Sequence, residues 1–389
     1  MRAMRAALVL AIVFLVFCTA GLLVRAVSPA GWRDAAAVGA LEGGQPQINL
    51  AQRELTASPA IKAQLVQLRG RIATEKLTFE VGYTTALDEP LEKLTGLKLP
   101  ENLAQEAVTT NQKAQELLGL DLKSRDAFAK ANPGKLTELQ LVQAPCAALA
   151  SYDWRTKNKV TPVRGPQNGC GSCWAFTTLG AFESSYAIRN NVLIDASEQQ
   201  ILNCSGAGSC AGGWWMPAFD YLIHHGVATE AAYPYTHNDL PCRTGVAGTY
   251  FATAWGFVHA AGGIPTVAEM KAALCRYGAL AVAVRATPLF QAYTGGVFNE
   301  HDPGPINHGV TLIGWSDANR AWIIKNSWGP GWGGTGGYGT ARGYMMIAWD
   351  SNHIGVAASW VQARSRFYRL PPIYFERIKK LTPVAPIKH

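Results

Sequence analysis

The spacing of hydrophobic residues changes along this 389-residue chain. From Phe176 the apolar side chains recur at Leu179, Phe182 and Tyr186, and a spacing of three to four residues is typical of one face of an α-helix. The second half contains short apolar runs at residues 280–284, 310–313 and 321–325 among many glycines, which predict β-strands. The pattern therefore predicts an α+β chain in which helices precede strands.

Cys173 lies in the first turn of the helix that the pattern predicts around Phe176. Unpaired backbone N–H groups and the helix dipole favour a negative charge at this end of a helix. We therefore expect the pKa of this thiol to be lowered, which enriches the nucleophilic thiolate. The glycines that precede it keep the approach open, so the position predicts a reactive cysteine.

Several short motifs make residues 147–361 resemble the papain and cathepsin family of cysteine peptidases. Residues 169–176 read Gly-Cys-Gly-Ser-Cys-Trp-Ala-Phe, and Gln167 lies six residues before Cys173. Residues 307–310 read Asn-His-Gly-Val, and residues 325–329 read Lys-Asn-Ser-Trp-Gly. Tyr-Asp-Trp-Arg at residues 152–155 is similar to the start of a mature enzyme of this family.

The resemblance implies a papain-like, two-lobed α+β fold with an active-site cleft between a helical lobe and a β-barrel-like lobe. It implies that Cys173 attacks as a thiolate, that His308 serves as acid and base, and that Asn326 orients the imidazole. Gln167 and the backbone N–H of Cys173 would stabilise the oxyanion. The implied activity is that of a cysteine endopeptidase with a thioester acyl-enzyme, and a transpeptidase using the same intermediate remains an alternative.

The resemblance also implies a substrate cleft whose second subsite carries no charge. Two glycines would let an extended substrate backbone approach closely, and indole side chains would cover the catalytic histidine. The implied substrate-binding residues are Gly212, Gly213, Trp214, Trp215, Ala283, Ile306, Gly309, Trp328 and Trp332. We therefore expect a preference for an apolar residue two positions before the scissile bond.

The cysteine count is compatible with one free nucleophile. Of eight cysteines, Cys18 lies near the N-terminus and Cys173 is the predicted nucleophile, which leaves the six that three disulfides need. The resemblance implies the pairs Cys170–Cys210 and Cys204–Cys242. We expect the two cysteines left over to form the third pair, Cys146–Cys275.

Cys170 and Cys173 are also spaced as a C-x-x-C redox or zinc pair. However, Trp174 follows the second cysteine, whereas redox pairs usually carry their tryptophan before the first. No clean second C-x-x-C or H-x-x-x-H pair completes a four-ligand zinc site. A redox or binding protein is thus the less favoured alternative, and no metal or organic cofactor is implied.

The N-terminus predicts export. Arg2 and Arg5 precede an uncharged run over residues 6–24, so residues 1–26 are expected to form a signal peptide or a membrane anchor. Either would place this segment in a membrane during or after export. The remainder would lie outside the cytoplasm, either anchored or secreted or periplasmic, where disulfides persist.

Two further segments flank the peptidase-like region. Residues 27–146 contain helix-like stretches at 48–71 and 103–118 but no catalytic motif. The resemblance implies an inhibitory propeptide that lies through the cleft, and a spacer is the alternative. Residues 362–389 carry a net charge of +6 and are expected to form a solvated basic tail. Because residues 147–361 have no net charge, the basic pI does not support nucleic-acid binding, and polypeptides are the expected partners.

Overall fold

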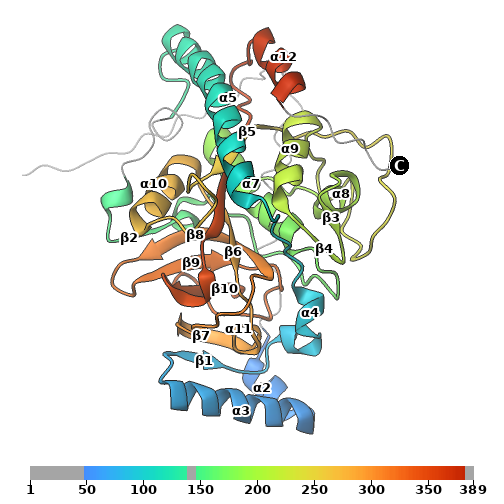
Figure 1. Ribbon diagram of the computed structural model, residues 1–389, viewed down its shortest axis with the longest axis vertical. Coiled ribbons are helices and arrows are strands. Elements are labelled where there is room, and N and C mark those ends of the chain that lie inside the picture. Colours follow the sequence, from blue (N-terminus) through green and yellow to red (C-terminus); the bar gives the residue numbers. More distant parts are fainter. Residues whose placement is uncertain (1–47, 138–145, 382–389) are drawn as a thin grey trace, which may run out of the picture.

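The computed structural model describes residues 48–137 and 146–381 and has an α+β architecture. A group of helices forms one lobe and a large sheet forms the other (Figure 1). The helical lobe contains α7 (Cys173–Asn190), α8 (Glu198–Cys204), α9 (Trp215–His224) and the short hairpin β3 (Gly208–Ser209) and β4 (Gly212–Gly213). Nearly all of α7 is buried, because this helix lies between the two lobes and packs on both.

The sheet of the second lobe has the order β1-β7-β10-β9-β8-β6-β11-β5, with β2 pairing with β8. Strand β1 (Phe79–Val81) comes from the N-terminal segment. The other strands of the sheet are β2 (Ser151–Asp153), β5 (Ala252–Phe257), β6 (Leu280–Val284), β7 (Tyr293–Phe298), β8 (His308–Ser316), β9 (Ala321–Lys325), β10 (Tyr344–Ala348) and β11 (Val356–Ala363). Helices α10 (Val267–Tyr277) and α11 (Pro288–Ala292) connect these strands. The strands predicted at 280–284 and 321–325 are confirmed with the same bounds.

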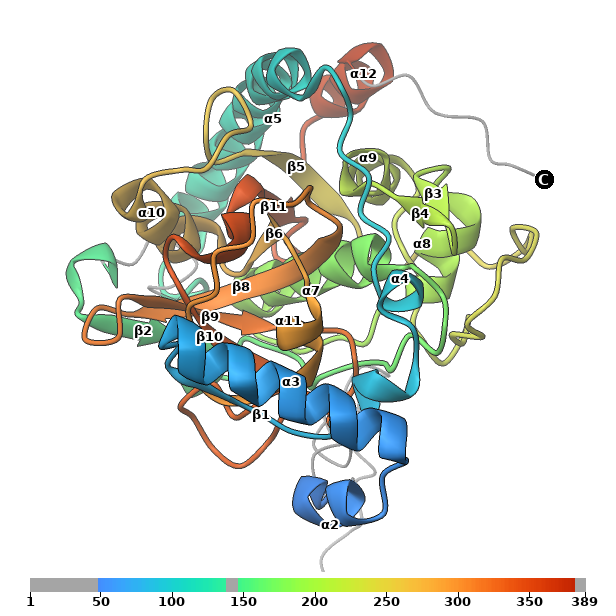
Figure 2. The ribbon, with the colours of Figure 1, turned by 60° about the horizontal axis from the view of Figure 1, so that its bottom comes forward.

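The N-terminal segment contacts the rest of the chain at both ends of the molecule. It contains α2 (Leu50–Leu55), α3 (Pro59–Glu75), β1 (Phe79–Val81), α4 (Leu91–Leu94) and α5 (Leu103–Ala131). Strand β1 pairs with β7 at one edge of the sheet, whereas α5 packs on β5 at the opposite edge (Figures 1 and 2). The helical stretch predicted at 48–71 is divided because Ser58 caps α3 and Pro59 occupies its first position.

The described part of the C-terminal segment is folded, so the prediction of a solvated basic tail is wrong there. Strand β11 continues to Ala363, and α12 (Pro372–Leu381) packs on α5 (Figure 1). Tyr374 is fully buried and donates a hydrogen bond to the backbone oxygen of Thr253 at 2.7 Å. Ile378, one turn further along the same face of α12, and Leu370, just before the helix, are buried with it.

No helix within residues 48–137 and 146–381 is long and apolar enough to cross a membrane. The predicted signal peptide or anchor at 1–26 lies outside the described residues.

Three disulfides connect the described cysteines in the pairs expected from the sequence. Cys170–Cys210 and Cys204–Cys242 lie in the helical lobe. Cys146–Cys275 joins the residues that precede β2 to the last turn of α10, with a Cα–Cα distance of 5.7 Å and a sequence separation of 129. This bond therefore ties the junction of the N-terminal segment to the second lobe.

Removal of the long-range bond is expected to destabilise the chain. A loop of this length corresponds to about 4–5 kcal/mol of chain entropy in the unfolded state, so C146S/C275S should lower the free energy of unfolding by up to this amount in urea titrations. Peptide mapping of the unsubstituted protein without reductant should recover the linked pair. Alkylation of both thiols in that experiment would contradict the assignment.

Candidate active site

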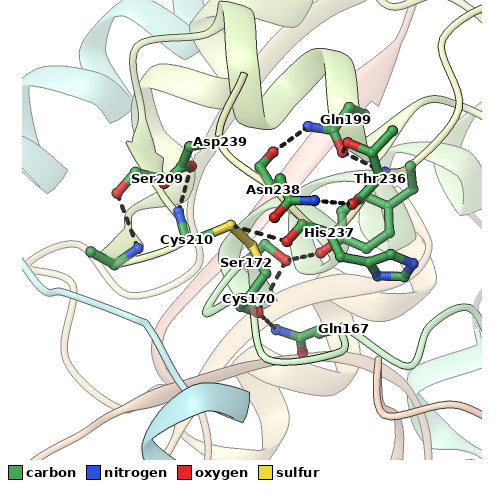
Figure 3. Close-up of a disulfide and its surroundings, with 12 residues drawn as sticks. Gln167, Cys170, Ser172, Gln199, Ser209, Cys210, Thr236, His237, Asn238 and Asp239 are labelled. Carbon is green, nitrogen blue, oxygen red and sulfur yellow. Dashed lines mark hydrogen bonds between the residues drawn. A yellow bond between two sulfur atoms is a disulfide. The ribbon is translucent and has the colours of Figure 1, made fainter. Parts of the chain in front are cut away.

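A disulfide and several hydrogen bonds hold the loop that leads into Cys173 at the start of α7. The Cys170–Cys210 disulfide anchors it to the β3–β4 hairpin (Figure 3). The N–H of Gly171 also donates to the backbone oxygen of Cys210 at 2.9 Å. Ser172 Oγ and Tyr235 OH share a hydrogen bond of 2.6 Å. Cys173 is then the first residue of α7 and the free cysteine of the described residues.

His308 and Asn326 meet across neighbouring strands. His308 begins β8, Asn326 follows the end of β9, and His308 Nε2 lies 2.8 Å from Asn326 Oδ1. The N–H of Ser327 also donates to Asn326 Oδ1 at 2.8 Å, which fixes the orientation of the amide. Because Oδ1 can only accept, His308 carries its proton on Nε2, and Nδ1 keeps its lone pair.

Aromatic rings enclose this hydrogen bond. The Trp328 ring lies over the imidazole with centroids 4.7 Å apart and planes inclined by 33°. Trp332 meets Trp328 edge to face and stacks on Phe290, which in turn touches His308 edge-on at 6.0 Å. These aromatic rings therefore exclude water from the His308–Asn326 hydrogen bond. Phe290 was not identified from the sequence, because no motif marks it.

Gln167 is fully buried and held by two polar contacts. Its Nε2 donates to the backbone oxygen of Cys170 at 2.9 Å (Figure 3), and its Oε1 accepts from Ser327 Oγ at 2.7 Å. One amide hydrogen is thus committed to Cys170, which leaves the second for another acceptor. Ser327 was also not identified from the sequence, although it lies within the motif that contains Asn326.

A buried charge network joins the helix of Cys173 to the strand before Asn326. Thr161 Oγ1 donates to Glu183 Oε2 on α7 at 2.5 Å and accepts from Lys325 Nζ on β9 at 2.9 Å. Burial lowers the pKa of Lys325 to about 8, and the nearby Glu183 opposes this shift. The network therefore fixes the end of β9 relative to α7.

The expected substrate-binding residues come together from both lobes. Ala283 on β6 is the register partner of Gly309 on β8, and a Cβ at Gly309 would lie 3.2 Å from the Trp215 ring. Trp214 packs on Trp215 with centroids 4.1 Å apart. Ile306 is half-buried two residues before His308.

Residues 94–100, here called the strap, pass between α9 and the strands on the way from α4 to α5 (Figure 2). The N–H groups of Gly96 and Leu97 both donate to the backbone oxygen of Asn307, at 3.0 and 2.9 Å. Gly213 donates to the oxygen of Gly96 at 2.8 Å and accepts from the N–H of Lys98 at 3.0 Å. The strap thus occupies the backbone groups of Gly213 that were expected to bind substrate.

Cys173 and His308 are both fully buried in this closed arrangement. Burial raises the pKa of the Cys173 thiol to about 11, although backbone N–H groups of Gly309, Gly96, Trp174 and Leu97 act in the opposite direction. The prediction of a lowered pKa is therefore wrong for this closed state. The reason is that desolvation under the strap outweighs the favourable end of α7.

The two buried groups give the closed state a window of pH stability. Burial lowers the pKa of His308 from 6.5 to about 4. The stability that this group contributes to the closed state is therefore fully present above pH 6.5 and is lost as the pH falls through about 4. The pKa of Cys173 is shifted in the opposite direction. The stability that this thiol contributes is present below pH 9.0 and is lost as the pH rises through about 11. The closed form is therefore favoured most at intermediate pH.

Comparisons with known proteins agree with this geometry. Residues 148–363 match the family model described as papain family cysteine protease. Digestive cysteine proteinase 3 of Homarus americanus is 39% identical over 196 residues, which cover 48% of this chain and 60% of that protein. The chain thus spans less than two thirds of the length of this relative.

Two solved structures share more of the chain. A digestive procathepsin L2 proteinase from the larval midgut of Tenebrio molitor superposes with a TM-score of 0.59 and 26% identity, covering 82% of this chain and 95% of that one. A recombinant stem bromelain precursor gives a TM-score of 0.54 and 27% identity, covering 78% and 89%. Each of these structures covers a larger part of this chain than residues 148–363, so the structural similarity extends beyond the region that matches the family model.

Gly96 provides a test of the strap. A Cβ at this position would lie 2.0 Å from the backbone oxygen of Gly171, so a G96A strap cannot keep its present path. Such overpacking costs about 1–3 kcal/mol, and we expect iodoacetamide to alkylate Cys173 roughly 10- to 100-fold faster at neutral pH.

The matched control is G119A in α5, where no atom lies within 4 Å of the added Cβ. This variant should react at the rate of the unsubstituted chain. Equal rates for G96A and G119A would show that the strap does not limit access to the thiol.

Proposed function

Because the chain belongs to the papain family of cysteine proteases, we propose that it is a cysteine endopeptidase made as a self-inhibited precursor. The observation that carries the proposal is the His308–Asn326 hydrogen bond of 2.8 Å, which fixes the imidazole. The free cysteine at the N-terminus of α7 accepts a hydrogen bond from the N–H of Gly309, the residue after His308. The substrates are polypeptides.

The reaction begins once the strap has left the cleft. Water then solvates both catalytic groups, and proton transfer from Cys173 to His308 Nδ1 forms a thiolate–imidazolium pair. The thiolate attacks the substrate carbonyl carbon, and the imidazolium protonates the departing amine. A water then attacks the resulting thioester and gives its proton to His308. The acyl–sulfur bond breaks, the acid product leaves, and the proton returns from the imidazolium to the sulfur. Asn326 keeps Nε2 protonated throughout and need not exchange a proton itself.

Gln167 and the N–H of Cys173 stabilise the oxyanion of each tetrahedral intermediate. Support comes from the two contacts that fix the Gln167 side chain, because one hydrogen of its amide remains uncommitted. A donor held rigidly before the charge develops costs no reorganisation during the reaction, and the loss of such a donor reduces kcat by roughly 100- to 1,000-fold.

The N-terminal segment, residues 27–146, acts as the inhibitory propeptide. Support comes from the strap, which takes up the backbone hydrogen bonds of Gly213 and buries Cys173. The similarity to a procathepsin and a bromelain precursor over about four fifths of the chain agrees with this role. A spacer alone would not enter the cleft, so inhibition is favoured over the alternative.

The proposed second subsite selects an apolar side chain. Support comes from the absence of charge on its residues, which are Trp214, Trp215, Ala283, Ile306 and Gly309. The three disulfides favour an exported protein in an oxidising compartment. Whether the exported form is anchored depends on residues 1–26.

The activity test uses a peptide library incubated with the chain after its N-terminal segment has been removed by acid treatment or limited proteolysis. We expect hydrolysis after an apolar residue at the second position before the cut, and C173A should lower kcat/KM by at least about 1,000-fold. The variant should still fold, because the thiol forms no disulfide. Loss of a buried sulfur should lower the free energy of unfolding by no more than about 3 kcal/mol.

Several outcomes would change the assignment. Unchanged turnover in C173A would rule out the nucleophile, and a profile dominated by Arg or Asp would rule out the apolar subsite. Amine adducts that exceed the hydrolysis products in the presence of an added acceptor would identify a transpeptidase.

A further inference from the structure

Helix α5 presents one continuous buried face to the catalytic region. Its buried residues recur every three or four positions, which places them on one side of the helix. They are Ala107, Thr110, Ala114, Leu117, Leu118 and Asp121. Asp121 continues an otherwise largely apolar stripe, so a carboxylate is buried where a hydrophobic side chain would be expected.

Three side chains from α7 and the C-terminal part of the chain surround the Asp121 carboxylate. Arg189, in the last turn of α7, donates to both carboxylate oxygens at 2.8 and 3.0 Å. Gln362 Nε2 at the end of β11 donates to Oδ2 at 2.8 Å. Tyr368 OH lies 3.1 and 3.2 Å from the two oxygens and also contacts Arg189.

The C-terminal segment supports the same helix. Beyond Tyr368, α12 lies beside α5 (Figure 1), and Arg377 pairs with Glu116 of α5 at 2.8 Å. Nearer the start of α5, Asn111 Oδ1 accepts a hydrogen bond from the N–H of Phe257 at 2.8 Å. Phe257 lies on β5, the edge strand of the sheet, so α5 satisfies a backbone donor of that edge.

We propose that Arg189, Gln362 and Tyr368 form a docking site that binds α5 through Asp121 even when the chain is cut between α5 and Cys146. The site holds the N-terminal segment non-covalently, separately from the strap. Release of the segment from the processed protein is therefore controlled by the C-terminal segment as well as by the cleft. This proposal concerns binding alone and does not require peptidase activity.

The charge arrangement makes Asp121 the decisive contact. On separation, water solvates the carboxylate, but Arg189 loses its two hydrogen bonds to Asp121 while remaining largely enclosed by the protein. Replacement of one partner of a buried ion pair costs several kcal/mol, which corresponds to roughly 100-fold or more in the dissociation rate. Loss of one hydrogen bond to a charged group costs less, roughly tenfold.

The test uses the full chain with C173A, so that no self-cleavage occurs, and with a site-specific protease sequence in place of residues 138–143. A cut there lies before Cys146, so the disulfide cannot retain the N-terminal fragment. Gel filtration after increasing times of dilution gives the dissociation rate. We expect the fragment to co-elute with the catalytic part, D121N to release it roughly 100-fold faster, and Y368F roughly tenfold faster.

The matched control is D126N, which makes the same charge change on the same helix at a side chain that is 65% exposed and pairs with its neighbour Arg125. It should release the fragment within about twofold of the parent rate. If D121N and Y368F both dissociate at the D126N rate, the docking site is refuted. Y368F alters only the catalytic part, so its faster release would support the proposal even if D121N disturbed the folding of α5.

Discussion

Burial of an uncharged thiol and an uncharged imidazole beneath the strap is the interaction on which the closed structure depends. Neither Cys173 nor His308 is accessible, and burial shifts the pKa of each toward its neutral form. The same groups need to be charged for catalysis of the proposed kind. Inhibition therefore rests on solvation as well as on steric blocking, since opening the cleft readmits the water that an ion pair requires.

A strap of a few residues can maintain this burial because it is held at both ends. On one side, β1 extends the sheet beyond β7, and Gln291 next to it donates to the backbone oxygens of Ala86 and Glu89. On the other side, α5 lies on β5 with Asp121 facing Arg189. Arg189 and Cys173 occupy opposite ends of α7, so the central helix contacts the N-terminal segment at the cleft and far from it.

The sequence predicted the elements that local patterns determine. The helix at Cys173 and the strands at 280–284 and 321–325 have clear periodicity or short apolar runs among glycines, and the structure contains each of them. Long-range packing could not be predicted in the same way. The pKa of the thiol rises because of burial, and the strap that covers it lies about 75 residues earlier in the chain. The folded C-terminal segment depends in the same way on α5, so local charge and helix position were misleading at both places.

The pH dependence of Cys173 alkylation by iodoacetamide, measured before and after removal of the residues that precede Cys146, tests the account most directly. In the intact chain the rate should rise only toward pH 11, because burial raises the pKa of the thiol. After removal, the midpoint should fall below the ordinary value of 9.0, because the thiol then lies solvated at a helix N-terminus beside an imidazole. A midpoint that is already below 9.0 in the intact chain and does not move on removal would contradict the account.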